Sequence, residues 1–226
     1  MKKITAIVFL VGVLSTAIAQ QKPYSQQMAQ TAMHIWPDSF AVKPGNPARW
    51  SYDQGVILKG IEGVWKLYGD ASYFNYIQHS MDFYVQDNGS IKDYKRDEFN
   101  IDHTNNGKVV MMLYNITGKE KYKKAVDNIR SQFNDHPRTK EGSFWHKKIY
   151  PWQVWLDGLY MGQPFYAEYA KLAKQDTVFD DIARQFINVE RHTRDPKTGL
   201  LYHGWDESKE QKWADPKTGC SPHFWG

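Results

Sequence analysis

The fold is decided by residues 107–133, which read GKVVMMLYNITGKEKYKKAVDNIRSQF. In the second half of this stretch, apolar side chains recur every three or four residues, at Tyr122, Ala125, Val126, Ile129 and Phe133. That spacing puts them on one face of an amphipathic helix. The first half has the same period, and a short turn around Gly118 separates the two halves. The stretch therefore predicts a helical hairpin.

The same pattern recurs on either side of this hairpin. Joints of similar composition precede Tyr73, Tyr122 and Phe179, which are 49 and 57 residues apart. A repeat of this size is typical of helical hairpins that stack into an open solenoid or close into a toroid. We expect about eight helices and no long strand.

The connections differ in length in an informative way. Turns within the hairpins are a few residues long, whereas the segments between hairpins run from about 86 to 101, 134 to 150 and 193 to 224. Loops of this length are uncommon in a compact domain and are often functional. Since they all fall at one end of an up-and-down repeat, we expect the site at that end.

Composition allows one sizeable domain and argues against some partners. The chain has 226 residues, of which 41% are hydrophobic and 15% aromatic, so it can bury a core. Its net charge of +4 is small and its basic residues are spread along the sequence, which argues against a nucleic-acid partner. A pI near 8.9 is compatible with an acidic sugar as ligand.

The N-terminus has the features of an export signal. Lys2 and Lys3 precede an apolar run from Ile4 to Leu14, and small residues follow at 17–19. We therefore expect residues 1–19 to be a signal peptide and residues 20–226 to be periplasmic or extracellular. A membrane anchor is the alternative, but the run is shorter than the roughly 20 residues that a bilayer crossing requires. No stable membrane insertion is expected after cleavage.

Asp157 is the first candidate for acid–base chemistry. We expect a helix from Trp152 in which Gln153 and Asp157, four residues apart, share a face. The apolar neighbours of Asp157 would desolvate its carboxyl group and so raise its pKa. The structural alternative is a carboxylate that caps a neighbouring element or pairs with a lysine.

Asp102 is the second candidate. It precedes the helix around Val109, so capping of that helix is the alternative to an active role. Because Asp102 and Asp157 both lie near the starts of equivalent helices, we expect the two carboxylates at the same end of the fold. Two acids in unequal environments are how sugar-cleaving enzymes divide acid and base work.

Histidines and tryptophans lie in or beside the long loops. His146, His203 and Trp225 are examples, and each could be structural rather than part of a site. The sequence has no HExxH motif, cysteine pair or close His/Asp spacing, so we predict no catalytic metal. It also lacks a phosphate loop, a dinucleotide fingerprint and a GxSxG elbow, and we predict no cofactor.

Three segments carry a family resemblance, namely FWHKKIYP (144–151), WLDGLYM (155–161) and YHGWDESK (202–209). In this order they resemble the unsaturated rhamnogalacturonyl hydrolases, glycoside hydrolase family 105, over about residues 24–226. The resemblance implies an all-α (α/α)6 barrel, with six helical hairpins in a ring and the site at one mouth. It also implies, as substrate, a lyase-generated oligosaccharide that ends in 4,5-unsaturated galacturonic acid, typically linked to rhamnose.

The resemblance further implies residue roles. Asp157 matches the aspartate that protonates C4 of the C4=C5 bond, after which water adds at C5 and the hemiketal opens and expels the sugar. Asp102 matches a residue that assists at the double bond or the water. The expected substrate-binding residues are Tyr52, His146, Gln153, His203 and Trp225.

Two points stay open at the level of sequence. The family continues past Trp225 with an arginine and further hairpins, so we expect these residues to be the N-terminal part of one incomplete (α/α)6 ring. Rival functions are an unsaturated glucuronyl hydrolase acting on glycosaminoglycan-type fragments, a polysaccharide lyase that creates the double bond, and a non-catalytic sugar-binding toroid.

Overall fold

The computed structural model describes residues 21–37 and 47–224. These residues form the helices α1 (Tyr24–Ile35), α2 (Tyr52–Tyr68), α3 (Ala71–Asp82), α4 (Gly107–Thr117), α5 (Glu120–Ser131), α6 (Leu156–Leu172) and α7 (Val178–Thr193). Short 3-10 helices lie between them at η1 (Arg96–Glu98), η2 (Ile101–Thr104) and η3 (Gln132–Asn134). Two short antiparallel strands are β1 (Gln153–Trp155) and β2 (Gly204–Asp206).

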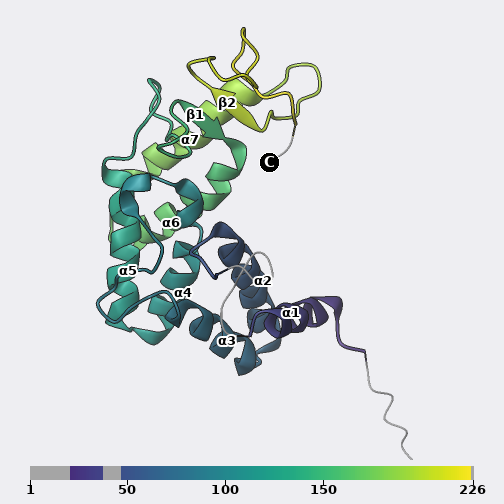
Figure 1. Cartoon of the computed structure of the whole chain (residues 1–226), viewed down its shortest axis with the longest axis vertical. Coiled ribbons are helices and arrows are strands. Elements are labelled where there is room, and N and C mark those ends of the chain that lie inside the picture. Colours follow the sequence, from purple (N-terminus) through teal and green to yellow (C-terminus); the bar gives the residue numbers. More distant parts are fainter. Residues whose placement is uncertain (1–20, 38–46, 225–226) are drawn as a thin grey trace, which may run out of the picture.

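The helices pair as predicted, α2 with α3, α4 with α5 and α6 with α7, and the three hairpins follow one another along an arc (Figure 1). The first helix of each hairpin packs on the first helix of the next, so α4 contacts both α2 and α6. This confirms an all-α fold of helical hairpins. The described part of the chain forms an open arc of the (α/α)6 type rather than a closed ring.

Local sequence explains the hairpins. On α5, the side chains of Tyr122, Ala125, Val126 and Ile129 are all fully buried, as the helical period predicts. Gly69 and Gly118 end α2 and α4 in the left-handed conformation, at φ 71° and 65°. Glycine adopts this conformation without a steric penalty from a β-carbon, which allows the sharp turn into the second helix.

The helix predicted from Trp152 is wrong at its start, because α6 begins only at Leu156. Trp152 has a left-handed backbone, with φ 64°, and residues 153–155 form β1 instead. Their backbone groups pair with β2, Gln153 opposite Asp206 and Trp155 opposite Gly204. Gln153 therefore projects from a strand, and Asp157 lies in the first turn of α6.

Two predictions fall on residues outside the described ranges. These are the signal peptide, residues 1–19, and the substrate-binding role of Trp225, so both stay predictions. Among the described helices, none is long and apolar enough to cross a membrane.

Candidate active site

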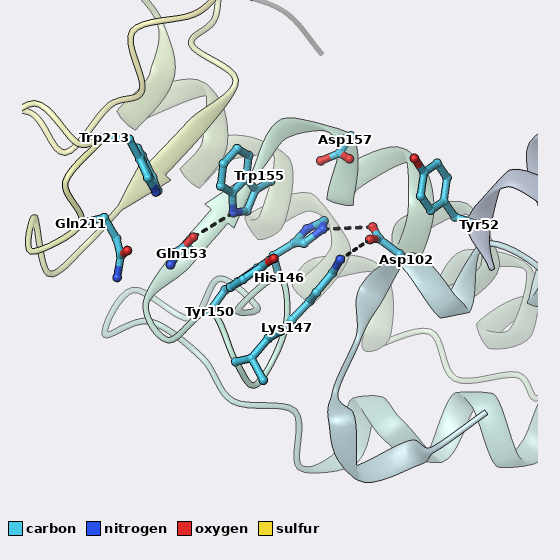
Figure 2. Close-up of a pocket in the computed structure, with 11 residues that line it drawn as sticks. Tyr52, Asp102, His146, Lys147, Tyr150, Gln153, Trp155, Asp157, Gln211 and Trp213 are labelled. Carbon is cyan, nitrogen blue, oxygen red and sulfur yellow. Dashed lines mark hydrogen bonds and ion pairs between the residues drawn. The ribbon is translucent and has the colours of Figure 1, made fainter. Parts of the chain in front are cut away.

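The long connections meet at the same end of the hairpins and border a cavity of about 570 Å³ (Figure 2). It is lined by Tyr52, Asp102, His146, Lys147, Ile149, Tyr150, Gln153, Trp155, Asp157, Gln211 and Trp213. Most of these residues come from the segments between hairpins, whereas Tyr52 and Asp157 come from the first turns of α2 and α6. The site thus lies where the loop lengths predicted it.

The backbone of His146 is held from two sides. The N–H of Ile101 donates to its carbonyl oxygen at 3.0 Å, and its own N–H donates to the carbonyl oxygen of Gln153 at 2.8 Å. The residue before it is held as well, since Nε2 of His136 donates to the carbonyl oxygen of Trp145 at 2.7 Å. Burial lowers the pKa of His136 to about 4, so its ring is neutral at neutral pH. His146 is thus fixed between η2 and β1.

The carboxylate of Asp102 is paired with two neighbouring side chains. Its Oδ1 lies 3.0 Å from Nε2 of His146 and its Oδ2 lies 2.6 Å from Nζ of Lys147 (Figure 2). Burial would raise the pKa of Asp102, but these two partners outweigh burial and lower the pKa to about 2. Asp102 is therefore ionised at neutral pH. It does not cap α4, whose N-cap residue is Asn106.

Asp157 lies close to this group but has no comparable partner. Its Oδ1 is buried and has no hydrogen-bond partner among the described residues. An oxygen of Asp157, an oxygen of Asp102 and a ring nitrogen of His146 all lie within 4.8 Å of one another. The structure therefore brings the two candidate carboxylates together in unequal surroundings.

Tyr52 stands across from Asp157, with its hydroxyl group directed toward the carboxylates (Figure 2). The negative charge of Asp53 raises the pKa of Tyr52, and burial and the charges of Asp102 and Asp157 raise it further. The phenol therefore stays protonated at neutral pH and can donate a hydrogen bond into the cavity.

Three residues of the site offer atoms that a metal ion could bind, namely Asp102, His146 and Asp157. The ammonium group of Lys147, 2.6 Å from Asp102, already supplies a positive charge to one of these carboxylates. The arrangement therefore fits an acid–base pair better than a cation cage, because a divalent ion beside Lys147 would meet a like charge. The absence of a catalytic metal stays a prediction.

The binding residues predicted from sequence are placed unequally. Tyr52, His146 and Gln153 line the cavity, but His203 does not line it as the described residues form it. The ring of His203 packs edge-on against Trp155, with centroids 5.1 Å apart. The indole N–H of Trp155 donates in turn to Oε1 of Gln153 at 3.2 Å. His203 therefore supports the aromatic wall.

Sequence reasoning did not assign five lining residues with polar or aromatic side chains to the site, namely Lys147, Tyr150, Trp155, Gln211 and Trp213. Lys147 and Tyr150 lie in the segment FWHKKIYP, where their proximity to His146 was a usable signal. The sequence held no comparable signal for Gln211, because the position of this residue depends on the turn after β2. There the buried carboxylate of Asp206 accepts hydrogen bonds from the N–H groups of Ser208 and Gln211, both at 3.0 Å.

Paired carboxylates at one mouth of a helical arc suit the acid–base work of a sugar-cleaving enzyme, and the sequence assigns the chain to one family of such enzymes. The profile of Glycosyl Hydrolase Family 88 matches residues 24–226, and the chain belongs to this family.

Individual relatives agree with this assignment. The unsaturated rhamnogalacturonyl hydrolase YesR of Bacillus subtilis is 25% identical over 167 residues, which are 71% of this chain and 46% of YesR. A family 105 glycoside hydrolase from C. acetobutylicum shares 48% identity and a TM-score of 0.82, over 90% of this chain and 55% of that one. A possible family 105 member from Klebsiella pneumoniae has 17% sequence identity and a TM-score of 0.69, over 92% of this chain and 59% of the Klebsiella chain. It shares the fold.

The relationship read from the three segments is thereby confirmed. The chain spans about half the length of the relatives it matches.

Proposed function

We propose that the protein is a glycosidase that removes 4,5-unsaturated galacturonic acid from the non-reducing end of lyase-generated rhamnogalacturonan oligosaccharides. The observation that carries the proposal is the pair of carboxyl groups within 4.8 Å. One is held ionised, and the other is half-buried with one oxygen that is buried and has no hydrogen-bond partner among the described residues. The membership of Glycosyl Hydrolase Family 88 and the name of the B. subtilis relative support the substrate class.

The pair suits a reaction that begins with a proton transfer. Two negative charges this close disfavour each other, and the cationic Lys147 keeps the charge on Asp102. We therefore assign the donation of the proton to Asp157, whose Oδ1 is buried and has no hydrogen-bond partner among the described residues. Given to C4 of the double bond, this proton leaves positive charge at C5, which the ring oxygen shares.

The second step adds water at C5. Asp102, as the ionised member of the pair, can accept a proton from that water and offset the positive charge. The hemiketal so formed opens and breaks the bond to the neighbouring sugar. Proton donation by Asp157 and acceptance by Asp102 leave the total proton count of the pair unchanged.

The walls of the cavity suit a sugar ring. Trp155 and Trp213 stand together with ring centroids 5.2 Å apart, and Tyr150 lines the same cavity. Flat aromatic faces beside polar groups such as Gln153 and Gln211 allow a pyranose to stack and form hydrogen bonds at once.

The test is the substitution Asp157→Asn, assayed by the ultraviolet absorbance of an unsaturated galacturonyl-rhamnose substrate. Asparagine keeps the shape of the side chain but holds no transferable acid proton, so we expect turnover to fall roughly a hundredfold or more. Asp176→Asn, at the exposed turn before α7, is the matched control and should keep wild-type turnover.

A thermal melt of each variant shows whether it is folded. Wild-type turnover by folded Asp157→Asn would move the proton donor elsewhere, with Asp102 as the first candidate. Absorbance that rises with time would indicate a lyase and contradict the proposed reaction.

A further inference from the structure

The residue after Asp157 packs closely against the site. A β-carbon placed on Gly158 would lie 2.9 Å from Nδ1 of His146. Real β-carbons essentially never approach another heavy atom to within 3.0 Å. Position 158 therefore has room for a hydrogen atom only, and the imidazole ring of His146 lies directly against the first turn of α6.

The two nitrogens of this ring have different surroundings. Nε2 lies 3.0 Å from Oδ1 of Asp102, and a carboxylate charge this close favours a protonated nitrogen over one with a lone pair, so Nε2 carries a proton. Nδ1 is buried and has no hydrogen-bond partner among the described residues. A second proton there would be a buried donor without an acceptor, close to the positive end of the α6 helix dipole.

We propose that Gly158 is a positioning residue that sets the proton of His146. By leaving the ring packed against α6, it holds a neutral imidazole whose protonated Nε2 lies 3.0 Å from Oδ1 of Asp102. The inference rests on the proposed function only in taking Asp102 as a member of the reacting pair. Neighbouring residues thus have complementary tasks, since Asp157 offers an acid group and Gly158 fixes the ring that keeps the other acid ionised.

A methyl group at position 158 would displace the ring, not the chain. The backbone of His146 is bonded to Ile101 on one side and to Gln153 on the other, so it cannot follow the ring. The imidazole must rotate about its side-chain bonds, and the contact from Nε2 to Asp102 opens. Nδ1 then reaches water or new partners, and both neutral tautomers become accessible.

The same helix provides a matched control one turn later. A β-carbon at Gly162 would lie 3.2 Å from Cγ2 of Ile101 and 3.6 Å from Oγ1 of Thr104, and His146 is not among its near neighbours. Gly162→Ala thus makes the same chemical change in the same helix and presses on η2, not on the imidazole. Both variants gain the helix propensity of alanine.

The experiment is nitrogen NMR of the protein labelled with ¹⁵N-histidine at neutral pH, with the signals of His146 assigned through His146→Gln. We expect the wild-type protein and Gly162→Ala to show one neutral tautomer, protonated at Nε2. Gly158→Ala should show a mixture of both tautomers while circular dichroism retains the helical signal.

Two results would overturn the proposal. One is a wild-type spectrum with the proton on Nδ1 or on both nitrogens, which decides the question even if Gly158→Ala fails to fold. The other is a folded Gly158→Ala with the wild-type tautomer. In an activity assay, Gly158→Ala should lower kcat at least tenfold with little change in KM. If the wild-type protein did not turn over the substrate, this would count against the proposed function and leave the tautomer result standing.

Discussion

The ion pair between Lys147 and Asp102 makes a prediction that needs no substrate. We consider Lys147→Met, which keeps a flexible side chain of similar length and removes the ammonium group 2.6 Å from Oδ2 of Asp102. Lys148→Met is the control, because Lys148 is the next residue, is exposed, and places its ammonium group 5.9 Å from the ring centroid of Phe99. Its backbone N–H donates to the carbonyl oxygen of Glu98 at 3.1 Å, a bond that the substitution leaves in place. Both variants lower the net charge by one.

The size of the effect follows from the pKa of Asp102, which lies at about 2 in the folded protein against an ordinary 3.8. A difference of almost two units corresponds to about 2.5 kcal/mol of stability from Asp102. Its side chain is only 10% exposed, so solvent screens this little. With one of its two partners gone, we expect the pKa of Asp102 to rise by about one unit and the protein to lose about 1–2 kcal/mol at neutral pH.

The sign of the pH dependence follows from the same shift. Because the folded pKa is depressed, the stabilisation is fully present above pH 3.8 and is lost as the pH falls through about 2. The stability difference between Lys147→Met and the wild-type protein should therefore be largest at neutral pH and shrink toward pH 2.

The measurement is urea unfolding at several pH values, together with carboxyl carbon NMR of Asp102. If Lys147→Met matched Lys148→Met in stability and left the titration of Asp102 in place, Lys147 would not be what keeps this carboxylate ionised.

Two further predictions concern the cavity wall and a loop anchor. Trp213→Ala removes one aromatic wall, and since such contacts are worth about 0.5–1.5 kcal/mol, KM should rise up to about tenfold with kcat nearly unchanged; an unchanged KM would show that the indole does not touch the substrate. Arg138→Met removes the two bonds of 2.7 Å to Asp181 that tie a long loop to α7, so unfolding by urea should show a loss of about 1–3 kcal/mol. Arg191→Met, which removes an exposed pair, should cost less than about 1 kcal/mol, and equal costs would contradict this view of the anchor.

The hairpins could be predicted because their signal is local. The buried positions of α5 recur with the helical period, and Gly118 marks the turn before it. The end of the fold that holds the site could also be predicted, since loop length alone indicates it. These features need no knowledge of which distant segments meet.

The inner arrangement of the site depends on distant contacts and could not be predicted. Residues 153–155 form a strand only because Gly204–Asp206 lies beside them, and the helical pattern around Trp152 gave no warning of this. The sequence places Lys147 next to His146, but only the folded loop shows that both side chains reach Asp102.

The short ladder between β1 and β2 also affects the order in which parts of the protein fold. Helical hairpins join residues close in sequence and can form early, whereas this ladder joins segments about fifty residues apart and must wait for the chain between them. The first N–H of α6, on Leu156, donates to the carbonyl oxygen of His203 at 2.7 Å. The start of the helix that carries Asp157 is therefore completed only when the segment around His203 has packed beside it. The helical scaffold can therefore form before the active site does, and the reacting groups take up their positions in the last steps of folding.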